Sequence, residues 1–157
     1  METGEIGDKQ ISASSSFDLE SVGPQNARIR TEKASGAWCP KSQIKYNSYE
    51  FLQISLNSTH IIQSIETQGR YANGTGSEYV NQYYIDYFRS GEQWIRYKNR
   101  TNHSLLSGNT DITTAVLQTL DPPIISSKIR IVPHSKERRT VCLRVELHGC
   151  KNFENHD

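Results

Sequence analysis

The sequence predicts an all-β domain, an antiparallel sandwich or barrel, and three observations support this. Apolar residues recur at every second position in short runs separated by Gly, Asn, Ser and Pro, with no long amphipathic helical pattern. Hydrophobic residues make up only 34% of the 157 residues, which indicates many exposed loops. Eight Tyr and two Trp argue against disorder, because disordered chains are poor in aromatic residues.

Seven segments carry the alternating, β-branched or aromatic pattern that is typical of strands. In chain order they are residues 51–56 (FLQISL), 60–65 (HIIQSI), 83–88 (YYIDYF), 94–97 (WIRY), 113–120 (TTAVLQTL), 128–132 (KIRIV) and 141–148 (VCLRVELH). Turn residues separate them: Gln68-Gly69 follows the second segment, Ser90-Gly91 follows the third, and Pro133 ends the sixth. Strands at this spacing are typical of antiparallel sandwiches and barrels.

Four connections are long enough to be functional loops: residues 14–27, 35–47, 70–78 and 133–140. Loops carry binding function more often than strands do. We therefore interpret residues 1–150 as one binding domain and residues 151–157 as a polar tail or linker.

The charge pattern excludes some classes of partner. The formal net charge is +1, so no global field would attract nucleic acid. A local basic cluster of Lys136, Arg138 and Arg139 is interpreted as a solvated turn.

No run of about 18 apolar residues is present to span a membrane. The polar start METGEIGDKQ is no signal peptide, so a secreted protein would have lost its leader.

Glycosylation sequons and cysteines indicate an extracellular protein. Asn-x-Ser/Thr sequons begin at Asn57, Asn73, Asn99 and Asn102. Three cysteines are present: Cys39, Cys142 and Cys150. Cys142 and Cys150 cannot pair if they lie on one extended strand, since eight residues span roughly 26 Å. Cys39 would then pair with one of them, unless all three are buried thiols in a cytosolic protein.

The chemistry of an enzyme is absent from the sequence. The five His residues show no metal-ligand spacing with Cys, Asp or Glu. No GxSxG motif, Gly-rich phosphate loop or HExxH motif is present. We therefore expect no catalytic activity, no metal and no cofactor.

A series of short motifs in a fixed order resembles one known family. In order they are QISASS at 10–15, NAR at 26–28, GAW at 36–38, FLQISL at 51–56, TQGR at 67–70, YFRSG at 87–91 with Trp94, GN at 108–109, PPII at 122–125, and LRVEL at 143–147 with Gly149-Cys150. This series resembles the discoidin domain, also called the coagulation factor V/VIII C-type domain, over residues 4–150. The resemblance implies an eight-stranded, jelly-roll-like barrel of the galactose-binding type, with its ligand loops at one end.

The resemblance is strongest to the collagen-binding domain of discoidin domain receptors. It implies a disulfide between Cys39 and Cys142, in the motifs Trp38-Cys39-Pro40 and Val141-Cys142-Leu143. It also implies a second disulfide between the two ends of the domain, which would give Cys150 a partner shortly before Met1.

The ligand site implied by these receptors is a trench with an Arg and a Glu eight residues apart, matched by Arg70 and Glu78. In these receptors an aromatic residue of the first loop, a Trp, packs against collagen, and the resemblance assigns Phe17 to that position. The sequence departs from the receptors at Ser35, Thr140 and Ser21, where they have Asp, Asn and Thr. The full set of expected ligand-binding residues is Phe17, Asp18, Leu19, Ser21, Ser35, Trp38, Arg70, Glu78 and Thr140.

Each of these assignments has a structural alternative. One of Phe17 and Leu19 could pack beneath their own loop, Trp38 is more often a core residue beside a disulfide, and Arg70 with Glu78 could be a plain surface pair. No oligomeric state is predicted.

Three classes of partner remain open. An extracellular protein, with collagen first, is the leading one. The second is an anionic phospholipid membrane, which Asp18 and Glu20 oppose and the basic loop at 136–139 supports. The third is a glycan, for which Tyr71 and Tyr79 could provide aromatic surface.

Overall fold

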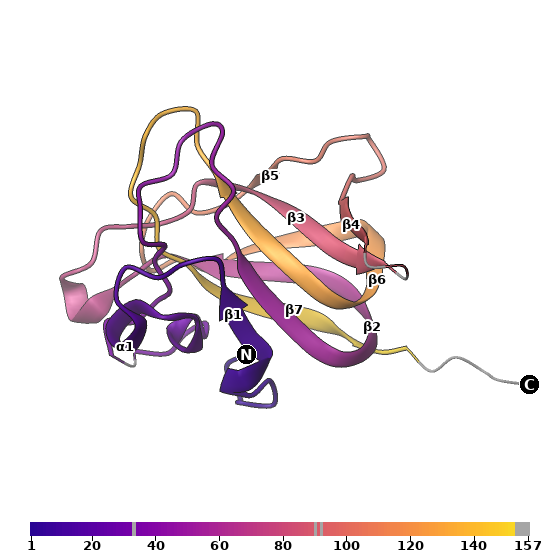
Figure 1. The fold of residues 1–157 in the computed structure, drawn as a ribbon, viewed down its shortest axis with the longest axis horizontal. Coiled ribbons are helices and arrows are strands. Elements are labelled where there is room, and N and C mark those ends of the chain that lie inside the picture. The colour runs from indigo at the N-terminus through magenta and orange to yellow at the C-terminus, as the bar shows by residue number, and fades with distance from the viewer. Residues whose placement is uncertain (33, 90, 92, 153–157) are drawn as a thin grey trace, which may run out of the picture.

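Seven strands of one antiparallel sheet dominate the computed structural model, which describes residues 1–32, 34–89, 91 and 93–152 (Figure 1). The strands are β1 (Ile11–Ala13), β2 (Leu52–Gln68), β3 (Gln82–Arg89), β4 (Gln93–Arg96), β5 (Leu106–Ser107), β6 (Val116–His134) and β7 (Arg144–Lys151). Helical segments are single turns: α1 (Leu19–Val22) and the 3-10 turns η1 (Asp8–Gln10), η2 (Pro24–Asn26) and η3 (Ala72–Gly74). The prediction of an all-β antiparallel domain is confirmed.

The sheet doubles over because β2 and β6 are long and bent. The strand order is β1-β2-β6-β3-β4, with β5 beside β3 and β7 beside β2. The first part of β2 lies between β1 and β6, whereas its second part lies between β6 and β7. The family resemblance implies eight strands in a jelly-roll-like barrel or sandwich, whereas the described residues form seven strands in a sheet that is not closed into a barrel.

Two pairs of predicted strands are each one continuous strand. Segments 51–56 and 60–65 form β2, with a register shift between Ser55 and His60. Residues 116–120 of the segment predicted at 113–120 join segment 128–132 in β6, whose register skips from Thr119 to Ile124. The polar and proline residues that indicated chain breaks are accommodated as bulges, which bend a strand without ending it.

The core lies between the two folded halves of this sheet. Ile54 and Ile131 from one half and Ile62 and Ile65 from the other are essentially fully buried in one cluster. Tyr83 of β3 is also fully buried there. At these positions of β2, β3 and β6, the alternating pattern of the sequence correctly predicts the inward face of the strand.

The bends bring both ends of β2 and both ends of β6 to the same end of the molecule. Leu52 pairs with Ile131 there, and Thr67 pairs with Val116. Residues 14–27, 35–47, 70–78 and 133–140 therefore emerge together, on the left of Figure 1. We call this end the loop pole. The strand bends and the end of β7 lie at the far end, on the right of the view.

The predicted tail is described only in its first part. Strand β7 extends to Lys151, one residue beyond the predicted boundary at 150, and Asn152 N–H donates to the Thr59 carbonyl at 2.9 Å. Residues 153–157 lie outside the described residues.

Candidate functional site at the loop pole

A disulfide joins two of the loops at the pole. Cys39 and Cys142 are bonded, with their Cα atoms 4.3 Å apart, and they pack with Val22 and Ala37 in a small buried cluster. The pairing implied by the family resemblance is therefore confirmed. Because the bond closes a separation of 103 residues, it restricts the unfolded chain strongly and holds residues 35–47 against the segment before β7.

The structure brings Arg70 and Glu78 together. Arg70 Nη1 lies 3.0 Å from Glu78 Oε2, and the backbone N–H of Arg70 donates to the Glu78 carbonyl at 2.9 Å. Both side chains are about three-quarters buried. The tight loop between them depends on Gly76, where an added Cβ would lie 2.0 Å from the Arg70 carbonyl oxygen.

Hydrogen bonds fix this pair to the neighbouring loops. Arg70 Nε donates to the Ser35 carbonyl at 2.9 Å, and Ser35 N–H donates to the Ser21 carbonyl at 3.0 Å. On the other side, Gln43 Nε2 donates to Thr140 Oγ1 at 3.1 Å. All four loops are thus tied together, which lowers the entropic cost of ordering them around a ligand.

Glu78 is in the ionised form that the ion pair with Arg70 requires. Burial alone would raise the pKa of Glu78, but the Ser77 N–H and the Arg70 guanidinium outweigh burial, so that pKa lies below its ordinary value. Glu78 is therefore ionised at neutral pH. Arg70 Nη2 has no hydrogen-bond partner within the described part of the chain, so it can donate to an oxygen of a ligand.

These loops enclose a cavity of about 350 Å³, which we call the trench. Most of the expected ligand-binding residues line it together with residues that the sequence did not indicate. The lining residues are Phe17, Ser21, Val22, Ser35, Cys39, Pro40, Lys41, Ser42, Gln43, Arg70, Glu78, Thr140 and Cys142.

The first loop presents apolar side chains to solvent. Phe17 is 74% exposed and Leu19 is 66% exposed, so neither packs beneath its own loop. Asp18 accepts a hydrogen bond from Ser21 Oγ at 2.7 Å across the short helix α1. Phe17 lines the trench, whereas Asp18 and Leu19 are not among its lining residues.

Trp38 supports the pole from inside. Its side chain is fully buried, and its indole Nε1 donates to the Ser15 carbonyl at 2.8 Å. Its backbone exchanges hydrogen bonds with Leu143 at 3.0 and 2.8 Å. The burial favours the core interpretation of Trp38 over direct ligand contact.

A buried arginine that the sequence did not single out also organises the pole. Arg144 is 2% exposed, and it donates to the carbonyls of Gly69 at 2.7 Å and Ile112 at 3.2 Å. Its Nη1 also lies 3.3 Å from Glu32 Oε1. The alternating pattern places Arg144 on the polar side of β7, but only the folded loops show that this side is covered.

The four sequons divide between the two ends. Asn57 lies in the bend of β2, and Asn99 and Asn102 lie beside Asp121 in the bend of β6, all at the far end. Asn73 alone lies at the pole, in η3, where it lines a second hollow beside Arg70. Their glycosylation remains a prediction.

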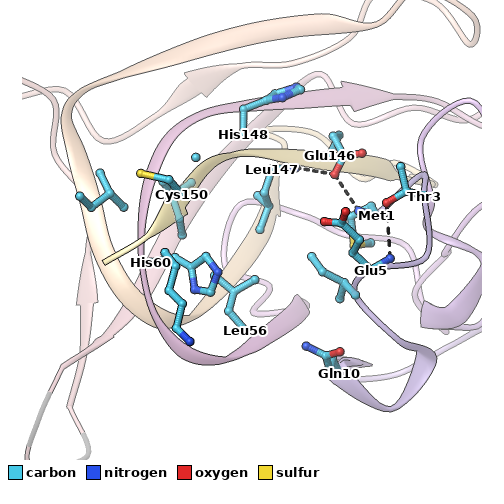
Figure 2. A pocket seen from close by; sticks show the side chains of 15 residues that line it. Met1, Thr3, Glu5, Gln10, Leu56, His60, Glu146, Leu147, His148 and Cys150 are labelled. Carbon is cyan, nitrogen blue, oxygen red and sulfur yellow. Dashed lines mark hydrogen bonds and ion pairs between the residues drawn. The ribbon is translucent and has the colours of Figure 1, made fainter. Parts of the chain in front are cut away.

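Cys150 lies at the far end as an exposed free thiol, opposite Ile61 on β2. It lines a cavity of about 520 Å³ together with Met1 and His148 (Figure 2). The first described residue and Cys150 therefore border the same hollow, and a partner located before Met1 remains a prediction.

Comparison with known proteins identifies the family. The family model "F5/8 type C domain" matches residues 10–147. The chain belongs to this family. The F5/8 type C domain is 64% identical over 152 residues to "Discoidin domain-containing receptor A" of Caenorhabditis elegans, covering 97% of this chain and 20% of that protein. It is 37% identical over 150 residues to human "Epithelial discoidin domain-containing receptor 1", covering 96% and 16%.

Solved structures agree on the fold. Discoidin II of Dictyostelium discoideum matches with a TM-score of 0.73 at 21% identity, covering 91% of this chain and 56% of that one. The F5/8 type C domain spans about a fifth of the length of its first receptor relative. It is an extracellular ligand-binding module of the kind found in receptors. No helix among the described residues is long and apolar enough to cross a membrane.

Proposed function

We propose that this domain binds triple-helical collagen in the trench at its loop pole. One observation carries the proposal: the Arg70–Glu78 ion pair, at 3.0 Å, lies in the wall of a cavity of about 350 Å³ whose rim carries the exposed Phe17. The resemblance to the receptors supports this proposal, because it implies an Arg–Glu pair and an aromatic residue of the first loop in their ligand trench.

The chemistry of the trench suits a collagen triple helix. The triple helix is built of extended chains that expose backbone carbonyls and apolar side chains. Arg70 Nη2 can donate to a carbonyl, while Phe17 offers an apolar contact beside it. The ion pair and the disulfide hold these groups in place before binding.

The charges of the first loop oppose the membrane alternative. Asp18 and Glu20 flank Leu19 on the exposed surface, so an anionic bilayer that received Leu19 would also meet two carboxylates. Of the two tyrosines expected for a neutral glycan, Tyr79 is covered by the Arg139 guanidinium, which lies 4.2 Å from the centre of its ring.

Surface plasmon resonance on immobilised triple-helical collagen tests the proposal. We expect Phe17→Ala, Arg70→Ala and Glu78→Gln each to weaken binding by about tenfold or more, as anchor residues of an interface do. Arg100→Ala is the matched control, because it breaks an exposed ion pair with Asp121 at the far end. Heat-denatured collagen should bind weakly.

Binding by the three trench variants that equals that of the unmodified chain would contradict the proposal. Equal binding to native and heat-denatured collagen would also contradict it. Selective binding to phosphatidylserine vesicles or to a neutral glycan, without collagen binding, would replace it.

A further inference from the structure

A second surface at the pole is formed by two loops that pair with each other. Ile44 N–H donates to the Arg139 carbonyl at 2.8 Å, and Arg139 N–H donates to the Ile44 carbonyl at 2.9 Å. The hydrogen bond between Gln43 and Thr140 continues this antiparallel register on one side. On the other side of this bridge, Lys45 follows Ile44 and Arg138 precedes Arg139. The two loops rise together at the upper left of Figure 1.

The paired loops carry a concentration of positive charge. We call the five cations Lys41, Lys45, Lys136, Arg138 and Arg139 the basic ridge. Loops 35–47 and 133–140 contain one carboxylate, Glu137, although the net charge of the whole chain is only +1. The remaining part of the chain is therefore net negative, and the ridge is a local feature.

These charges form no ion pairs within the part of the domain that the structure describes. Over residues 1–32, 34–89, 91 and 93–152, none of the five cations forms an ion pair, whereas Arg28, Arg30, Arg70, Arg96, Arg100 and Arg144 all do. Four of the five are exposed to solvent. The fifth, Arg139, lies over the Tyr79 ring. This cation–π contact orients the guanidinium without neutralising its positive charge.

The surroundings of the ridge suit an external anion. Lys45 and Arg138 each adjoin the bridge between Ile44 and Arg139, which brings like charges from two loops to one surface. Lys136, Arg138 and Arg139 also border a hollow of about 420 Å³. Tyr46, next to Lys45, is 70% exposed and offers an aromatic face beside the charges.

We propose that the basic ridge binds a sulfated polysaccharide. Its repeated sulfate groups would neutralise cations spaced along the ridge, and its sugar rings would pack on Tyr46. A linear polyanion can follow the ridge and avoid Asp18 and Glu20 of the first loop. A flat anionic membrane that covered the pole would have to approach these two carboxylates. Lys41 also lines the trench, so the two binding surfaces adjoin.

Binding of the full chain to immobilised heparin tests the proposal. The double variant Lys45→Ala/Arg138→Ala removes two ridge charges without altering a residue that lines the trench. The matched control Lys9→Ala/Lys98→Ala removes the same charge from exposed sites within η1 and beside Asn99, away from the pole. We expect the ridge variant to bind heparin roughly 10- to 30-fold more weakly, and the control to bind as the unmodified chain does.

Three further measurements make the outcome decisive. Desulfated heparin should not bind, and raising the salt concentration should weaken the binding of heparin. The thermal unfolding midpoint of the ridge variant should match that of the control, which excludes misfolding as the cause of the loss. Equal losses in the two variants, binding to phosphatidylserine vesicles in place of heparin, or the absence of heparin binding would each overturn the proposal.

Discussion

Arg144→Met should destabilise the whole domain, because the loop pole is built around this buried guanidinium. Arg144 holds the carbonyls of Gly69 and Ile112 at 2.7 and 3.2 Å, and it reaches Glu32 at 3.3 Å. A methionine keeps most of the volume and removes every donor. The change in stability therefore measures the contribution of the hydrogen bonds and charge of Arg144, with little contribution from packing.

The magnitude follows from what the substitution leaves behind. A buried carbonyl that loses its donor costs about 1–3 kcal/mol, so the two closest contacts account for roughly 2–6 kcal/mol. Part of this loss is offset in the variant, because burying the charged guanidinium costs free energy in the unmodified protein and methionine avoids that cost. Burial lowers the pKa of Arg144, and the charge of Glu32 only partly opposes that effect. We expect a net loss of about 2–4 kcal/mol in the free energy of unfolding.

Urea unfolding followed by tryptophan fluorescence measures this loss, since Trp38 is fully buried at the pole. Arg100→Met serves as the control, because the Arg100 side chain is exposed and its ion pair with Asp121 lies in solvent. The control should unfold at the same urea concentration as the unmodified chain. An Arg144→Met midpoint that equals that of the control would refute the assigned role of Arg144.

Three other substitutions or conditions test separate parts of the pole. Cys39→Ser/Cys142→Ser should lower the free energy of unfolding by about 2–5 kcal/mol in denaturant titration, and an unchanged value would show that the bond contributes nothing. Gly76→Ala places a Cβ 2.0 Å from the Arg70 carbonyl, so collagen binding should fall sharply in surface plasmon resonance; full affinity would refute the tight loop. The lowered pKa of Glu78 means that its stabilising contribution is complete above its ordinary value of 4.5 and is lost as the pH falls through the lowered value. Glu78→Gln should therefore reduce the acid sensitivity of unfolding, and unchanged acid sensitivity would contradict the ion pair.

The strand pattern of the sequence indicated the sheet but not its connectivity. Alternation places Val145 and Leu147 on the inward face of β7, and the structure agrees. The same pattern divided β2 near Asn57, because a bulge and a chain break both replace apolar residues with polar ones. Only the pairing partners on either side of β2 show that the strand continues.

The candidate site was predictable where sequence motifs specify it. Cys39 with Cys142, and Arg70 with Glu78, came from the family resemblance, and the structure brings each pair together. Lys41 lines the trench only because of the path that its loop takes, and no sequence motif predicts that path. The basic ridge likewise depends on the pairing of two loops almost a hundred residues apart, which local patterns cannot report.

Nuclear magnetic resonance titration of the labelled domain with a triple-helical peptide tests the central claim most directly. We predict that chemical shifts change at the loop pole, at Phe17, Arg70 and Thr140, while those at Asn57 and Ile61 in the far end stay unchanged. Changes concentrated at the far end, with an undisturbed pole, would contradict the claim that the trench receives the ligand.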